Sequence, residues 1–274
     1  MQYHTLPSGQ AIPMLGFGTY RLSGTSGADA VAQAIELGYT HIDTASNYEN
    51  EEAVGQGIKD SGKARAELFI TTKVGRDNLS YDDALQTCEK SLKALQLEYV
   101  DLLLIHWPNL EIPLEDTLAA FARLVQQGQV KNIGISNFIR PRVDKAIQLS
   151  RLPIAVNQVE YHPYLNQEAL RQHCQQRQIL LIAYSPLAIG AVLQDETLLG
   201  IAANHAKTPA QIALRWLLHK DIAAVPKASS TAHMAANIAL FDWQLSAAEI
   251  TRMDAIPTVK RVIDWWPGNF EQDT

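Results

Sequence analysis

Eight short apolar runs recur along this chain, and their spacing constrains the fold more than any other feature. The runs begin near Leu15, His41, Leu68, Val100, Lys131, Ile154, Ile179 and Ile222. Amphipathic helical stretches separate them, and this alternation is typical of a parallel sheet. Eight repeats predict a closed (β/α)8 TIM barrel of the α/β class, and 274 residues suit a fold that needs about 250. We therefore expect a single barrel domain over residues 1–274.

Capping residues and turn residues mark the ends of several elements. Ser80 to Asp83 forms a capping-box pattern, and Thr208 with Pro209 is typical of an N-cap followed by the first helical residue. Gly128 provides a left-handed helix stop. Near the N-terminus, Pro7-Ser8-Gly9 separates two short apolar pieces. This pattern predicts a β-hairpin, which we expect to plug the lower face of the barrel.

The composition argues against several classes of protein. Acidic residues exceed basic ones by six, so nothing indicates a nucleic-acid partner. No apolar run approaches the ~18 residues of a membrane span, and the N-terminus has no apolar targeting core. Cys88 and Cys174 lack CxxC or metal-ligand spacing, and the histidines lack such spacing as well. We expect a cytoplasmic protein without a metal, whose cysteines are core residues.

Four polar residues stand at or just beyond the carboxyl ends of three predicted strands. They are Asp43, Tyr48, Lys73 and His106. In a parallel barrel these strand ends share one mouth, so a carboxylate, a phenol, an ammonium and an imidazole should converge there. This set suits carbonyl reduction, in which an acid protonates the developing alkoxide while hydride arrives from elsewhere.

The roles of the four residues follow from elementary electrostatics. A phenol has a pKa of about 10, and a positive charge ~4 Å away at an effective dielectric constant of 20 contributes about 4 kcal/mol, or roughly three pK units. Lys73 would supply that charge and lower the pKa of Tyr48, although burial should make the net lowering smaller. Asp43 would keep Lys73 protonated, and neutral His106 would orient the substrate carbonyl. The alternative is that Asp43 and Lys73 form a purely structural ion pair.

Two nucleotide-binding motifs and the Tyr-Lys pair of another dehydrogenase class fail on inspection. Residues 57–64 nearly match a P-loop, but Ala64 replaces the hydroxyl that binds magnesium, and the segment is more typical of a helix end. Residues 16–21 begin like a dinucleotide fingerprint, yet Arg21 stands where the third glycine belongs. No tyrosine has a lysine four residues later, which disfavours the Tyr-Lys pair of short-chain dehydrogenases. A Rossmann domain is therefore not expected.

The chain resembles the aldo-keto reductases, barrel enzymes that use NADPH without a Rossmann domain. The pieces that carry the resemblance are GFGTY (16–20), HIDTASNYENEEAVG (41–55), LFITTKV (68–74), DLLLIHWP (101–108), KNIGISNF (131–138), NQVEYHPY (157–164), AYSPL (183–187) and VPKASS (225–230). The family's catalytic tetrad falls on the same four residues. The resemblance implies NADPH-dependent reduction of small aldehydes, ketones or dicarbonyls, with NADH as a secondary cofactor. In its compact length the chain also resembles bacterial 2,5-diketogluconate and methylglyoxal reductases.

The resemblance also assigns residues to the cofactor and the substrate. The cofactor residues are Ser136, Asn137, Gln158, Tyr184, Ser185, Leu187, Lys227, Ser229, Ser230, His233 and Asn237. The first three would hold the nicotinamide carboxamide, Tyr184 would stack on the ring, and the residues from Lys227 to Asn237 would meet the adenosine phosphates and the adenine. Tyr20, Trp107 and His106 would line the substrate pocket.

Some positions depart from the family. His233 stands where relatives carry an arginine for the 2′-phosphate, so we expect only a moderate NADPH preference that weakens as pH rises. Val74-Gly75 replaces a tryptophan-bearing segment and should leave that side of the pocket more open. Trp265-Trp266 would cap the substrate mouth or pack against the rim.

We expect a monomer. The alternatives are a cofactor-binding regulatory subunit on the same fold and a metal-dependent barrel hydrolase or isomerase.

Overall fold

The computed structural model describes residues 1–257 and 261–263. Its strands are β1 (Tyr3–Thr5), β2 (Ala11–Pro13), β3 (Phe17–Gly18), β4 (His41–Asp43), β5 (Phe69–Val74), β6 (Val100–Ile105), β7 (Val130–Ser136), β8 (Ile154–Glu160), β9 (Leu180–Tyr184) and β10 (Ala223–Ala224). Its α-helices are α1 (Gly24–Glu36), α2 (Glu51–Asp60), α3 (Tyr81–Leu95), α4 (Leu114–Gln126), α5 (Arg140–Leu149), α6 (Glu168–Gln175), α7 (Glu196–His205), α8 (Pro209–His219), α9 (Thr231–Ile238) and α10 (Ala247–Asp254). Short 3₁₀ segments are η1 (Ser46–Tyr48), η2 (Arg65–Glu67), η3 (Arg76–Asn78) and η4 (Ala188–Gln194).

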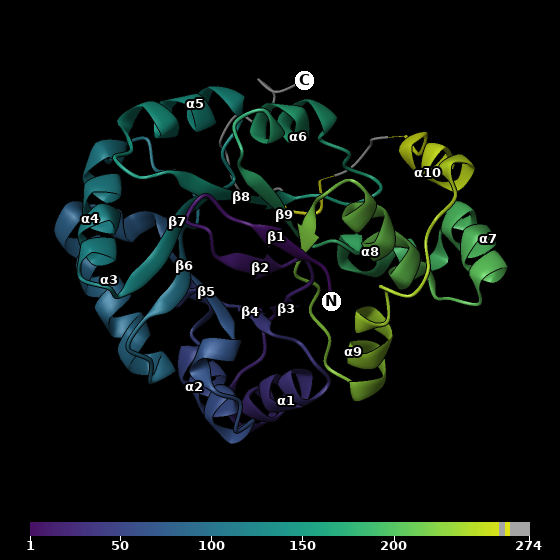
Figure 1. Cartoon of the computed structure of the whole chain (residues 1–274), viewed down its shortest axis with the longest axis horizontal. Coiled ribbons are helices and arrows are strands. Elements are labelled where there is room, and N and C mark those ends of the chain that lie inside the picture. Colours follow the sequence, from purple (N-terminus) through teal and green to yellow (C-terminus); the bar gives the residue numbers. More distant parts are fainter. Residues whose placement is uncertain (258–260, 264–274) are drawn as a thin grey trace.

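The eight strands from β3 to β10 form one parallel sheet in sequence order. The sheet closes because Ala224 of β10 bonds on both sides of Leu15: its carbonyl accepts from Gly16 N at 2.8 Å, and its N–H donates to Met14 O at 2.9 Å. At Gly18 a Cβ would lie 2.6 Å from the Val225 carbonyl, so glycine permits this close approach. Helices surround the strands, with α7 and α10 beside α8 on one side (Figure 1). The predicted (β/α)8 barrel is confirmed.

The predicted N-terminal hairpin is also confirmed. β1 and β2 pair antiparallel, Gly9 adopts a φ of 85° in their turn, and the hairpin crosses the centre of the ring of strands (Figure 1). Gln10 donates to Asp101 at 2.6 Å and accepts from Asn132 at 2.7 Å, and these two residues lie near the amino ends of β6 and β7. The hairpin therefore covers the end of the barrel opposite the strand carboxyl ends.

The local signals behave as their chemistry predicts. Ser80 accepts from Asp83 N at the start of α3, and Thr208 forms a full capping box at the start of α8. Gly128 has a φ of 76° just after α4 ends. Cys88 and Cys174 are buried in the core, as expected.

Candidate active site

The four candidate residues converge at the carboxyl ends of neighbouring strands. Asp43 ends β4, Lys73 is the penultimate residue of β5, and His106 directly follows β6. Tyr48 ends η1, the short turn that follows β4. Parallel pairing of β4 with β5 and of β5 with β6 brings these ends together at one mouth.

Lys73 is the centre of the cluster and is fully buried. Its Nζ donates to Asp43 Oδ1 at 2.6 Å, to the Thr44 carbonyl at 2.7 Å and to the Tyr48 hydroxyl at 3.5 Å. Three acceptors match the three N–H groups of an ammonium. Burial acts to lower the pKa of Lys73, but Asp43 and then Tyr48 outweigh it, and the net shift is upward. The site therefore keeps a positive charge in a region without solvent.

Gln158 completes the surroundings of Asp43. Its Nε2 donates to Asp43 Oδ2 at 2.7 Å, so both carboxylate oxygens of Asp43 accept a bond from a buried donor. Sequence reasoning assigned Gln158 to the cofactor and did not find this bond, because β8 and β4 are far apart along the chain. The only sequence signal was that Gln158 lies near a strand end, as the tetrad residues do.

The predicted pKa of Tyr48 is wrong in sign. We expected a net lowering by Lys73, but the pKa of Tyr48 is raised because burial outweighs the attraction of Lys73. Asp43, whose Oδ1 lies 2.6 Å from Lys73 Nζ, also raises the pKa of Tyr48, but its effect is smaller than those of burial and of Lys73. Tyr48 is consequently a protonated phenol near neutral pH.

His106 stands edge-on to Tyr48, with ring centroids 5.5 Å apart. Burial, and then the charge of Lys73, lower the pKa of His106 to about 3, so the imidazole is neutral near pH 7, as expected. Its Nδ1 has no hydrogen-bond partner among residues 1–257 and 261–263. Its carbonyl accepts from Asn137 Nδ2 at 3.0 Å. The ring is thus a neutral donor or acceptor at the mouth.

The residues predicted to hold a nicotinamide ring form a network beside the tetrad. Asn137 adopts a φ of 64° after β7, and its Oδ1 accepts from the Tyr184 hydroxyl at 2.8 Å. Its Nδ2 also donates to Ser136 Oγ at 3.1 Å. Ser185, with a φ of 47°, and Leu187 follow β9 and are half-buried. Their roles toward a cofactor stay predictions.

A second group lies at the N-terminus of α9. Lys227, Ser229, Ser230 and His233 are exposed, and the Ser230 side chain caps the helix by accepting from His233 N. Asn237 is buried on the same helix. The positive end of a helix dipole beside a lysine fits an anionic group such as a phosphate.

The predicted substrate residues flank Tyr48 unequally. Tyr20 is 53% exposed and lies edge-on to Tyr48, with ring centroids 5.1 Å apart, whereas Trp107 is buried. Beside Gly75, where we expected an open side, the Asn47 side chain occupies the place that a Cβ would take, so Asn47 narrows this side of the mouth. Trp265-Trp266 lies outside the described residues.

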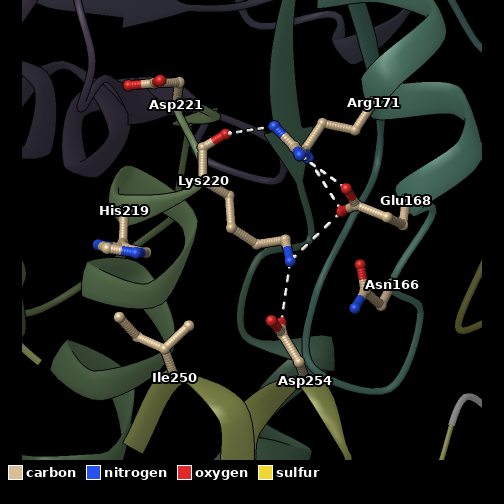
Figure 2. A pocket seen from close by; sticks show the side chains of 8 residues that line it. All are labelled: Asn166, Glu168, Arg171, His219, Lys220, Asp221, Ile250 and Asp254. Atoms are coloured by element: carbon tan, nitrogen blue, oxygen red, sulfur yellow. Dashed lines mark hydrogen bonds and ion pairs between the residues drawn. The ribbon is translucent and has the colours of Figure 1, made fainter. Parts of the chain in front are cut away.

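An open pocket of about 490 Å³ lies on the outside of the barrel, between α6, α8 and α10 (Figure 2). Lys220 bridges Glu168 at 3.4 Å and Asp254 at 2.9 Å, and Arg171 pairs with Glu168 at 2.6 Å. None of the tetrad residues lines this pocket. Its lysine and arginine are paired with Glu168 and Asp254, so it carries a surface ion-pair network and is not part of the barrel mouth.

In the part of the chain that the structure describes, no group of three or more His, Cys, Asp or Glu side chains could hold a metal ion. Within the same residues, no helix is long and apolar enough to cross a membrane.

Comparison with known proteins identifies relatives over nearly the whole chain. A glyoxal reductase from Bacillus subtilis (strain 168) is 41% identical over 258 residues, covering 94% of this chain and 93% of that protein. Methylglyoxal reductase DkgB from Escherichia coli O157:H7 is 39% identical over 256 residues, covering 92% and 96%. An aldo-keto reductase from Bombyx mori, solved in complex with NADP, has a TM-score of 0.91 and 34% identity, covering 96% of this chain and 95% of that chain.

A family model also matches nearly the whole chain. Residues 14–257 match the Aldo/keto reductase family. This range includes every tetrad residue and the barrel strands from β3 to β10. The resemblance drawn from the sequence is confirmed, and the chain belongs to the aldo/keto reductase family of oxidoreductases.

Proposed function

We propose that this chain reduces small aldehydes, ketones or dicarbonyls to alcohols, with NADPH as cofactor and Tyr48 as proton donor. The observation that carries the proposal is the position of Lys73, whose buried ammonium lies between Asp43 and Tyr48. A phenol that is protonated near pH 7 can donate a proton, and a fixed ammonium beside it stabilises the phenolate that remains. The relatives named glyoxal reductase and methylglyoxal reductase support a small dicarbonyl substrate.

The residues at the mouth divide the reaction between them. When bound, the reduced nicotinamide supplies the hydride that adds to the carbonyl carbon. An N–H of neutral His106 donates a hydrogen bond to the carbonyl oxygen and orients it toward the Tyr48 hydroxyl. As the C=O π electrons move onto oxygen, the Tyr48 O–H bond breaks and its proton completes the alcohol. Asp43, itself held by Gln158, keeps Lys73 in place throughout.

The residues present also fit a nicotinamide dinucleotide. The amide and hydroxyl groups of Ser136, Asn137 and Gln158 lie beside the tetrad and suit a carboxamide. Lys227 and the capped N-terminus of α9 suit phosphate groups. The solved relative in complex with NADP supports this cofactor.

A steady-state screen of glyoxal, methylglyoxal and sugar ketones tests the proposal. NADPH oxidation is followed with each carbonyl, and NADH is tested in parallel. Many turnovers per chain are expected with at least one dicarbonyl. Tight cofactor retention with a single slow turnover would instead favour the regulatory-subunit alternative.

A further inference from the structure

Glu160, the last residue of β8, carries a fully buried carboxylate that the reaction does not use. Three N–H groups donate to it. His162 Nε2 and Val262 N reach Oε1 at 2.9 and 2.7 Å, and Ile263 N reaches Oε2 at 3.1 Å. A buried charge is costly unless such donors surround it. Two consecutive backbone amides of the segment Arg261–Ile263 thus donate hydrogen bonds to one carboxylate about one hundred residues earlier in the chain.

The position of Glu160 places this segment at the barrel mouth. Side chains two residues apart on a strand point to the same face, so Glu160 lies on the face of β8 that carries Gln158, about 6.6 Å further along the strand. Gln158 contacts Asp43, and Glu160 pairs with Tyr184 across β8 and β9. Burial raises the pKa of Tyr184, Glu160 adds to the rise and Arg261 opposes it. The segment therefore lies near both the tetrad and Tyr184.

The donors around Glu160 are themselves fixed. His162 is fully buried, and its Nδ1 accepts from the Tyr164 backbone N–H at 3.2 Å, which leaves the proton on Nε2 to donate to Glu160. A second link runs parallel to this one: Gln167 Nε2 donates to the Glu160 carbonyl at 2.6 Å, and Arg261 donates to Gln167 Oε1 at 3.5 Å. Glu160 is consequently a rigid attachment point.

We propose that Glu160 is a positioning residue that ties the segment Arg261–Ile263 to the end of β8 and thereby sets substrate affinity at the barrel mouth. The effect on affinity rests on the proposed carbonyl reduction, whereas the attachment itself does not. Glu160 acts on KM through the segment and leaves the proton transfer from Tyr48 unchanged.

Two variants remove the attachment from opposite sides. Glu160→Gln keeps the shape but loses the charge and one acceptor oxygen, and Val262→Pro removes one backbone donor while Glu160 stays intact. Val262→Ala is the matched control because it keeps the N–H. Limited proteolysis with mass spectrometry measures cleavage around residues 261–263, and steady-state kinetics measure KM and kcat with methylglyoxal.

Both disrupting variants should be cleaved faster, with KM raised about three- to tenfold and kcat within about twofold, because loosening the segment weakens substrate binding by about as much as the loss of one ordinary hydrogen bond. The double variant should add little, since both changes break one contact. Val262→Ala should match wild type. Unchanged cleavage and KM in both disrupting variants would overturn the proposal, as would an equal effect of Val262→Ala. An inactive wild type combined with faster cleavage of the disrupting variants would reject the proposed function and retain the attachment.

Discussion

Lys73 and Lys220 each lie between oxygen acceptors, but only Lys73 lies beside the candidate proton donor Tyr48. Lys73 and Asp43 have side chains that are 0% and 4% exposed. Lys220, in the outer pocket of Figure 2, is 9% exposed, but its partner Asp254 is 39% exposed. Water and salt screen an exposed pair, which contributes about 0–1 kcal/mol to stability. The buried pair is not screened in this way, so Lys73 lowers and Asp43 raises the pKa of Tyr48, and Lys73 also lowers the pKa of His106.

Removing each lysine gives the largest expected contrast. Lys73→Met should abolish carbonyl reduction and lower the free energy of unfolding by about 3–5 kcal/mol, because Asp43 is left as an uncompensated buried charge. Lys220→Met should leave kcat within about twofold and change the free energy of unfolding by less than about 1 kcal/mol. Steady-state kinetics and urea unfolding measure both. Similar losses of activity in the two variants would remove the distinction between the two sites.

Asp43→Asn should impair reduction less than Lys73→Met does. The ammonium remains, but an amide nitrogen would face either Lys73 Nζ or Gln158 Nε2, both of which donate to Asp43. The loss of one charge-assisted bond predicts an about 10- to 100-fold decrease in kcat. In the double variant, which carries both Asp43→Asn and Lys73→Met, the two losses of activity should not add. A double variant whose loss is the product of the single losses would argue against a shared network.

The barrel interior should also make the fold sensitive to acid. Burial lowers the pKa of His41 to about 4, and burial followed by Lys73 lowers that of His106 to about 3. The unfolded chain binds these protons near pH 6.5, so the stability is fully present above pH 6.5 and falls as pH decreases toward 4. Each histidine contributes a slope of up to about 1.4 kcal/mol per pH unit.

Urea unfolding between pH 4.5 and 7 measures this slope. His41→Gln should reduce this slope by the contribution of one histidine, up to about 1.4 kcal/mol per pH unit, whatever its effect on absolute stability. His219→Gln is the matched control, because His219 is exposed. An unchanged slope in His41→Gln would show that His41 titrates alike in the folded and unfolded states.

The smallest predicted effect concerns the choice of cofactor. His233 is exposed beside Ser230 at the start of α9. An imidazole carries charge only in acid, whereas arginine offers a permanent charge and a bidentate fork. The NADPH preference should therefore decline several-fold from pH 6 to 8.5 and rise in His233→Arg, with little change for NADH. Dissociation constants for both cofactors measure it. A preference that neither pH nor the substitution changes would remove His233 from the cofactor site.

The fold and the tetrad were predictable because both follow from local patterns. Strand-helix alternation predicts the barrel, and residues at strand ends such as Asp43 and Lys73 must share its mouth. The raised pKa of Tyr48 was not predictable, since it depends on how closely Asp43 approaches Lys73 and on how deeply the phenol is buried. The contact of Glu160 with the segment Arg261–Ile263 likewise joins distant parts of the sequence. No local pattern signals such a contact.

The central claim is that Tyr48 donates the proton while Lys73 supports it, and Tyr48→Phe tests it most directly. The variant removes only the hydroxyl, so kcat and kcat/KM for methylglyoxal should fall together by about 10²–10⁴-fold, with the dissociation constant for NADPH unchanged. Both quantities come from steady-state kinetics and cofactor titration on the same preparation. Retention of more than about a tenth of the wild-type kcat would contradict general-acid catalysis by Tyr48.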